Sequence, residues 1–136
     1  MVEGKNKYAL KRDDLLYPEL SFTINGILFD IAKTLGGGHK EKYYDKAISV
    51  AFTKKNIPFV YQVYVPLTYQ GETVGKYFID FVVENKIAIE VKRGQFVSSS
   101  VITQTKQYLS ALKLKLGIIA CFTHSGVVIK RVLNEY

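Results

Sequence analysis

Apolar residues recur at every third or fourth position in two segments near the start of the chain, a spacing typical of amphipathic helices. The first segment, Glu19–Leu35, follows Pro18, which favours a helix start, and is ended by three consecutive glycines. The second runs from about Lys40 to Asn56 and ends before Pro58. The predicted inner faces are Leu20, Ile24, Ile27, Leu28, Ile31 and Leu35 in the first helix, and Tyr44, Ile48, Ala51 and Phe52 in the second.

The middle of the chain is rich in Val, Ile, Phe and Tyr, which favour β-strands. Phe59–Thr68 alternates well enough to predict a strand. Lys76–Arg93 contains two apolar arms around the polar break Glu84–Lys86, a pattern that predicts a hairpin. A third helix is expected after the serines at 98–100, followed by two strands, Leu116–Phe122 and Val127–Leu133.

This order, ααβββαββ, predicts an α/β fold. The strand after the third helix can return parallel to an earlier strand through a right-handed crossover. We therefore expect a mixed central sheet of about five strands, flanked by helices. The length of 136 residues fits one domain, which we expect at residues 18–136, after a basic arm at residues 1–17.

Three charged residues interrupt the apolar hairpin: Asp80 in its first arm, and Glu90 and Lys92 in its second. Glu90 and Lys92 share one face, because side chains of a strand point the same way at every second residue. If Asp80 joins that face, the hairpin presents two oxygen ligands for Mg²⁺ and a lysine that can orient an attacking water. The alternative is a solvated face with a cross-strand salt bridge, and the Glu-x-Lys pattern alone does not decide between them.

Glu41 lies at the start of the second predicted helix and on its inner face. It either complements the positive end of the helix dipole or reaches a metal at the edge of the sheet. The three glycines before it permit a close backbone approach. They do not form a phosphate-binding loop, since the Lys-Ser/Thr of that motif is missing.

The chain carries a net charge of +7 and has a pI of about 9.4. This charge favours nucleic acid or an anionic membrane as the partner, although a basic surface also occurs without such a partner. The start of the chain has no apolar signal core, and no run reaches transmembrane length, so we expect a cytoplasmic protein and no membrane contact. The single Cys121 and the two histidines show no zinc-ligand spacing.

Asp80, Glu90-Val91-Lys92 and the helical pair Gln104 and Tyr108 together form a pattern that resembles the PD-(D/E)XK nuclease superfamily. The superfamily places an acid on one core strand, acid-x-Lys on the next, and Gln-x-x-x-Tyr on a helix. An acid on a preceding helix, here Glu41, is a further mark. The resemblance implies a restriction-endonuclease-like core.

A closer resemblance, to the small GxxExxR family, covers about residues 17–133. Its defining stretch here is residues 38–44, in which Tyr44 stands where the family's name has Arg. The other matching segments are Tyr17–Ser21, Ile24–Gly26, Leu35–Gly38, Tyr69–Glu72, Gly75–Asp80 and Leu116-Gly117. Ala32 and Cys121 replace a His and an Asn that are usual in the family.

The resemblance implies a phosphodiesterase that depends on Mg²⁺ or Mn²⁺. The implied metal ligands are Asp80, Glu90, the Val91 carbonyl and Glu41, the last directly or through water. Lys92 is the implied catalytic lysine, and Gln104 and Tyr108 are expected to orient it or the substrate.

Three hypotheses follow. The first is a nuclease acting on DNA, in which Lys76 and Arg93 either contact phosphates or are simply surface charges. The second is a catalytically silent module of the same fold that binds nucleic acid or senses its structure. The third is a protein-interaction domain: Phe22 and Phe29 lie off the main apolar face of the first helix, where they form a homodimer contact or a second core layer.

Overall fold

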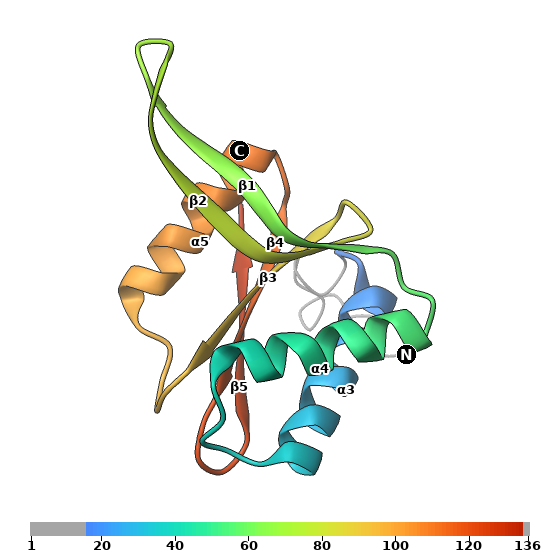
Figure 1. Ribbon diagram of the computed structural model, residues 1–136. Helices are drawn as coiled ribbons and strands as arrows, with labels where there is room; N and C mark the ends of the chain where they lie inside the picture. Colours follow the sequence, from blue (N-terminus) through green and yellow to red (C-terminus); the bar gives the residue numbers. More distant parts are fainter. Residues whose placement is uncertain (1–15, 135–136) are drawn as a thin grey trace, which may run out of the picture.

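The computed structural model describes residues 16–134, so residues 1–15 of the predicted basic arm lie outside the described residues. The predicted order of elements is confirmed (Figure 1). The elements are α3 (Pro18–Leu35), α4 (Glu41–Lys54), β1 (Phe59–Tyr69), β2 (Glu72–Val83), β3 (Ile87–Arg93), α5 (Ser99–Leu112), β4 (Leu116–Phe122) and β5 (Val127–Leu133).

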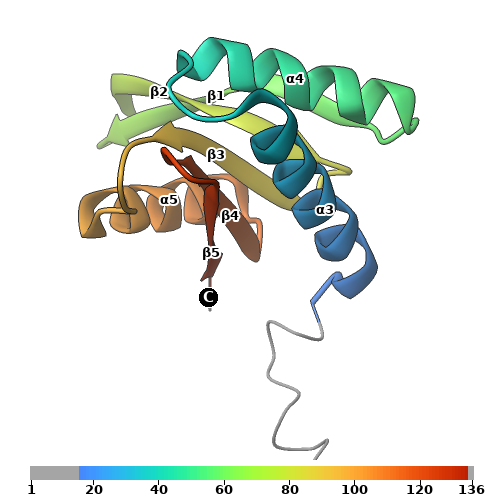
Figure 2. The same ribbon diagram turned by 90° about the horizontal axis from the view of Figure 1, so that it is seen from below.

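The five strands form one mixed sheet in the order β1-β2-β3-β4-β5, which confirms the predicted fold class. Strands β3 and β4 are parallel, and α5 makes the crossover between them; the other neighbouring strands are antiparallel. Helices α3 and α4 cover one face of the sheet and α5 covers the other (Figure 2). No helix within residues 16–134 is long and apolar enough to cross a membrane.

Each face of the sheet has its own hydrophobic core. The larger core joins α3 and α4 to the sheet, and within it Tyr44 stacks on Phe122 with ring centroids 4.1 Å apart. The smaller core packs α5 against the opposite face, around Leu109 and Ile119. Both sides of the central strands are therefore buried, which explains why β4 is buried at every residue.

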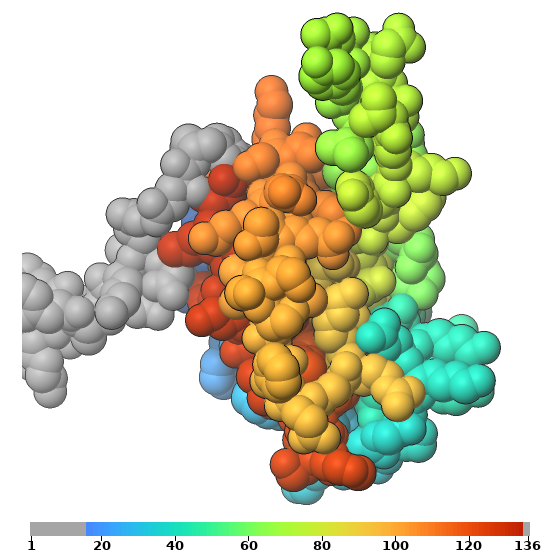
Figure 3. All heavy atoms as spheres, turned by 90° about the vertical axis from the view of Figure 1, so that its left-hand side faces the viewer, coloured from blue at the N-terminus to red at the C-terminus, as the bar shows by residue number. Residues whose placement is uncertain are grey.

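The hairpin of β1 and β2 is longer than the sequence predicts. Strand β2 begins at Glu72, four residues before the expected start at Lys76, and pairs with β1 almost to the turn at Gln70-Gly71. The tip of this hairpin projects beyond the surface formed by α5 (Figures 1 and 3). Both strands expose aromatic side chains along it, among them Tyr64 and Phe78, which face each other across the two strands.

The glycine-rich turn between α3 and α4 packs against the turn between β4 and β5. A Cβ atom on Gly37 would lie 2.5 Å from the Thr123 carbonyl oxygen and 2.9 Å from His124 Cα. Gly36 and Gly38 both have positive φ, at 77° and 88°. The sequence therefore needs glycine here for two reasons, the close approach of two backbones and the left-handed conformation on either side.

Replacing Gly37 with Ala should lower the free energy of unfolding by about 1–3 kcal/mol, because the new methyl group meets backbone that cannot move aside. Chemical denaturation monitored by circular dichroism measures the change. Gly26→Ala in α3 is the matched control: a Cβ atom at position 26 would have no neighbour within 4 Å, and Ala should stabilise the helix by up to about 1 kcal/mol. Equal stability of Gly37→Ala and the wild type would contradict the tight contact.

Candidate active site

The backbone pairing of β2 is interrupted at Asp80. On one side, the pairing with β1 runs from Tyr61–Phe81 to Val63–Ile79 and omits Gln62 and Asp80; Gln62 adopts a φ of +63°. On the other side, the pairing with β3 ends where Phe81 faces Ile89. The two strands therefore separate at the level where the sequence places its first acid.

Carboxylates take the place of the missing backbone partners. The Asp80 amide donates a hydrogen bond to Glu90 Oε1 at 3.1 Å, and the Val91 amide donates to Asp80 Oδ2 at 2.7 Å. The N–H and C=O groups of one strand residue point to the same side, so the Val91 carbonyl also faces this gap. Two carboxylates and one carbonyl are thus held at the same opening in the sheet.

Burial and mutual repulsion make these acids hard to ionise. Glu90 is only 4% exposed, and burial, followed by the charge of Asp80, raises its pKa to about 8. Burial likewise raises the pKa of Asp80, against the opposing effects of the Val91 amide and of Lys92. Lys92 is half-buried on the same strand as Glu90, and its charge lowers the pKa of both carboxylates. The predicted trio of Asp80, Glu90 and Lys92 therefore lies together.

Glu41 joins this group from α4. Its Oε2 accepts a hydrogen bond from the Arg93 amide at 3.2 Å, where β3 ends, and its charge contributes to the raised pKa of Asp80. Glu41 thus lies both in the first turn of α4 and at the edge of the sheet, so this geometry is compatible with both interpretations. Arg93 itself is exposed at the margin of the site.

Helix α5 brings Tyr108 to the opposite side of the acids. Tyr108 is 5% exposed, and its ring centroid lies 5.6 Å from that of Tyr77. Burial, together with the charges of Glu90, Tyr77 and Asp80, raises its pKa to about 12, so the phenol keeps its proton even in alkaline solution. Gln104 lies one turn earlier on α5 and is half-buried, and its side chain makes no hydrogen bond within the described part of the chain.

Lys76 is not brought to this group. It lies four residues before Asp80 on β2, opposite Pro66, which places it about 13 Å away along the strand at about 3.3 Å per residue. Its side chain is exposed on the projecting hairpin. Any contact of Lys76 with nucleic acid would therefore be made at the hairpin and away from the acids.

Two residues beside the acids, Asp45 and Tyr61, were not predicted from the sequence. Asp45 on α4 is 7% exposed, and its Oδ2 accepts a hydrogen bond from the Tyr61 hydroxyl at 2.8 Å. Burial, then the charge of Asp80, and less strongly that of Glu41, raises the pKa of Asp45 to about 6. The sequence contained a sign of this position of Asp45. It lies four residues after Glu41, so the two acids share one face of the helix.

The donors at this site suit a hard cation. Carboxylate and carbonyl oxygens, completed by water and a substrate phosphate, are the ligands that Mg²⁺ prefers. Within residues 16–134, no group of three or more His, Cys, Asp or Glu side chains is close enough together to hold a metal ion by itself. The fit therefore rests on the oxygen atoms of Asp80, Glu90 and the Val91 carbonyl, which are held at the same break in the sheet.

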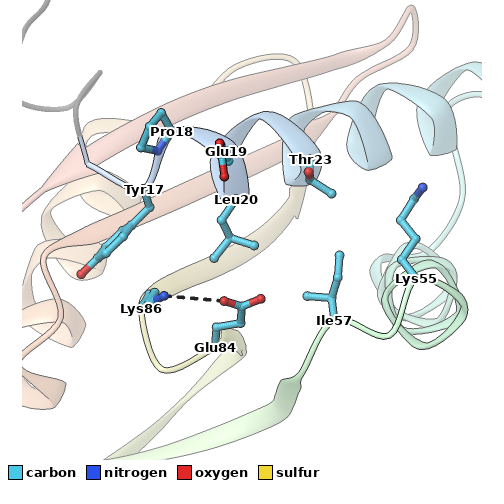
Figure 4. Close-up of a pocket in the computed structure, with 9 residues that line it drawn as sticks. All are labelled: Tyr17, Pro18, Glu19, Leu20, Thr23, Lys55, Ile57, Glu84 and Lys86. Atoms are coloured by element: carbon cyan, nitrogen blue, oxygen red, sulfur yellow. Dashed lines mark ion pairs between the residues drawn. The ribbon is translucent and has the colours of Figure 1, made fainter.

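A separate hollow of about 830 Å³ lies at the start of α3, near the turn between β2 and β3 (Figure 4). Its lining includes Tyr17, Leu20 and an ion pair of 3.7 Å between Lys86 and Glu84. None of the acids described above lines it. The candidate active site is thus defined by the break in the sheet and not by this hollow.

The fold is of the restriction-endonuclease-like type, and comparison with known proteins agrees with this class. A model of the PD-(D/E)XK nuclease superfamily matches residues 18–132, and the chain belongs to this superfamily. No curated protein matches the chain significantly. Among solved structures, the crystal structure of SSO0001 is similar in fold, with 17% identity and a TM-score of 0.54 over 70% of this chain; the match spans only half of that chain's length.

In the metal-free protein, the free energy of unfolding should fall as the pH rises from about 5 to about 8. Folded Glu90, with its pKa of about 8, keeps a proton that the unfolded chain has already lost at its ordinary pKa of 4.5. The destabilisation is therefore complete above about pH 8 and absent below the ordinary pKa. Urea denaturation in the presence of a chelator, repeated across this pH range, measures the slope.

Glu90→Gln should make this dependence shallower and leave only what Asp45 and Asp80 contribute, because the amide oxygen can still accept the Asp80 amide hydrogen bond while one titrating group is gone. Glu72→Gln, at the exposed start of β2, is the matched control and should keep the wild-type slope. Parallel pH profiles for the wild type and Glu90→Gln would contradict the raised pKa.

Proposed function

We propose that the protein is a metal-dependent nuclease that hydrolyses phosphodiester bonds in DNA. The observation that carries the proposal is the break in the sheet, where Asp80 and Glu90 are fixed by backbone amides beside Lys92. Membership of the nuclease superfamily supports the same class of reaction.

In this proposal Asp80, Glu90 and the Val91 carbonyl hold Mg²⁺ or Mn²⁺, and Glu41 completes the site directly or through water. The bound cation supplies a more acidic water and neutralises charge on the phosphoryl group. Lys92 orients the attacking water and places its ammonium group where negative charge develops.

Tyr108 and Gln104 complete the proposed site from the α5 side. The protonated Tyr108 hydroxyl donates a hydrogen bond to the substrate or to a water beside Lys92. The Gln104 side chain lies one turn away on α5, has no hydrogen bond within residues 16–134, and is available to a phosphate or a base.

The net charge of +7 supports a polyanionic substrate. Arg93, exposed beside the acids, is the proposed phosphate contact nearest to the reaction. Lys76 is proposed to contact nucleic acid further away, on the projecting hairpin.

Cleavage of nucleic acid should require the metal ion, Asp80 and Lys92. Linear duplex, supercoiled plasmid, single strand, flap, four-way junction and RNA are incubated with Mg²⁺ or Mn²⁺, and cut products are separated on gels. Asp80→Asn should remove a metal ligand, and Lys92→Ala should remove stabilisation of the developing charge; each should reduce the rate at least about 10²- to 10³-fold.

The matched control for Lys92→Ala is Lys33→Ala, an exposed lysine in the last turn of α3 that should leave cleavage unchanged. Circular dichroism verifies that every variant is folded. Full activity in folded Lys92→Ala would remove the core of the proposed mechanism.

The alternative is a catalytically silent module of the same fold that binds nucleic acid or senses its structure. It is favoured by the lack, within residues 16–134, of three side chains that can hold a metal together. Strongly salt-dependent binding without metal-dependent cleavage of any substrate would support this alternative. The raised pKa values of two buried acids favour the enzyme, because a binding protein has no evident need for them.

We further propose that the chain is a member of the GxxExxR family and that the protein is cytoplasmic.

We also propose that the protein forms a homodimer through α3. The homodimer is supported by Phe22 and Phe29, whose side chains are 80% and 56% exposed. Sedimentation velocity should then show association that depends on protein concentration, and that weakens in Phe22→Ser. A monomer over a wide concentration range would contradict the homodimer.

A further inference from the structure

One face of the projecting β1–β2 hairpin is open to solvent. Val65 and Ile79 of this hairpin point into the smaller core, on the α5 side of the sheet. Because successive residues of a strand alternate between the two faces, Tyr64 and Phe78 point to the opposite side. Helix α4 contacts that side of β1 at Tyr61, and the hairpin extends well beyond α4 (Figure 1). Tyr64 and Phe78 therefore lie past the edge of the helical layer.

Four exposed residues form a compact patch on this open face, and we call them the hairpin patch. Tyr64 lies opposite Phe78, and Pro66 lies opposite Lys76, so the two cross-strand pairs are neighbours. The two aromatic rings meet at 55° with their centroids 5.8 Å apart, and the residues are 48% and 45% exposed. Lys76 forms no ion pair with any residue in the range 16–134. Two aromatic rings and one ammonium group are thus presented on the same side.

The stability of the hairpin does not by itself explain an exposed phenylalanine. A cross-strand aromatic pair does stabilise two strands, but β-branched residues also favour strands and expose less apolar surface. The ring of Phe78 has no polar group that water could hydrate, in contrast to the tyrosine opposite it. Aromatic rings beside a cation are what proteins offer to single-stranded nucleic acid: bases stack on the rings, and the cation contacts the phosphate backbone.

The hairpin patch adjoins the proposed active site along β2. Phe78 lies two residues before Asp80, about 7 Å away along the strand at about 3.3 Å per residue. A DNA strand with one phosphodiester group at the acids can therefore reach the patch with its neighbouring nucleotides. In a duplex the bases are stacked on one another, and an enzyme must take a base out of the stack to contact its ring. Only unpaired bases are directly available to Tyr64 and Phe78.

We propose that the hairpin patch is a base-stacking surface for the unpaired bases of a DNA strand whose phosphodiester group lies at the acids. Tyr64 and Phe78 stack on bases, and Lys76 contacts an adjacent phosphate. The substrate class is then DNA with a single-stranded segment next to the cleaved bond, and not uninterrupted duplex. The inference rests on the proposed function, and it names the class of DNA that the site receives.

The test measures binding of fluorescently labelled DNA to the full chain by anisotropy, with a chelator present to prevent metal-dependent cleavage. The probes are a single strand of mixed sequence and a blunt duplex of the same sequence. Tyr64→Thr and Phe78→Thr each remove a ring and retain a residue that favours strands. Each should weaken binding of the single strand at least about 5-fold, because a stacking contact is lost. Binding of the duplex should not change, since its bases do not reach the patch.

Three further variants make the design specific. Tyr64→Phe retains the ring and should bind the single strand far more tightly than Tyr64→Thr. Val60→Thr is the matched control: Val60 is 57% exposed on β1, but it pairs with Val82 of the smaller core and so lies on the opposite face. It should bind the single strand as the wild type does. Lys76→Gln should reduce the slope of log affinity against log salt concentration by about 0.7.

Circular dichroism verifies that each variant is folded, and if one of the two Thr variants does not fold, the other decides. Unchanged binding of the single strand, or an equal loss for single strand and duplex, would overturn the stacking role. Sedimentation velocity tests another occupant, a second copy of this chain. Loss of self-association in the Thr variants, with single-strand binding retained, would assign the hairpin patch to that copy and overturn the inference.

Cleavage separates this inference from the proposed function. If the wild type cuts DNA with Mg²⁺ and the Thr variants bind the single strand as tightly as the wild type, the stacking role fails and the nuclease stands. If the wild type cuts none of the DNA substrates and the Thr variants lose affinity for the single strand, the nuclease fails and the stacking role stands. Cleavage by the wild type, together with a selective loss of single-strand binding in the Thr variants, supports both.

Discussion

The candidate site depends on one exchange of hydrogen bonds. A regular sheet satisfies each backbone amide with a carbonyl of the neighbouring strand. Where β2 leaves the regular pairing, the amides of Asp80 and Val91 instead donate to the carboxylates of Glu90 and Asp80. The backbone avoids unsatisfied donors, and each acid is fixed through one of its oxygens by a rigid element. Such pre-organisation is what a site for a small, hard cation requires.

This exchange gathers negative charge that the protein alone does not neutralise. Burial and mutual repulsion raise the pKa values of Asp80, Glu90 and Asp45, and the opposing charge that acts on the first two comes from Lys92. Amide hydrogen bonds offset part of this effect but not all of it. The two hydrophobic cores on either side of the sheet therefore have to stabilise an arrangement that is unfavourable without a cation.

The fold was predictable because hydrophobic spacing alone decides most of its elements. The bounds of β4 and β5 agree with the prediction residue for residue, since both are short segments rich in Val, Ile and Leu between turn signals. Strand periodicity also places Glu90 and Lys92 on one face, whereas the position of Asp80 beside them depends on the pairing of the two strands. What spacing cannot reveal is a break in pairing: Gln62 gives no sign of its positive φ. Hydrophobic spacing also does not show that Lys76 lies far from the acids. That distance follows from the rise of about 3.3 Å per residue along a strand.

The position of Glu41 connects the glycine-rich turn to the chemistry. Tyr44 stacks on Phe122 of β4, and its hydroxyl donates to the Gly36 carbonyl at 2.7 Å, so the start of α4 is fixed to the sheet and to the preceding turn together. Gly37 lets that turn lie directly against Thr123. These contacts determine where the first turn of α4 meets the end of β3, and therefore that Glu41 reaches the Arg93 amide. Three glycines without a phosphate-binding motif thus serve the site indirectly, by placing one of its acids.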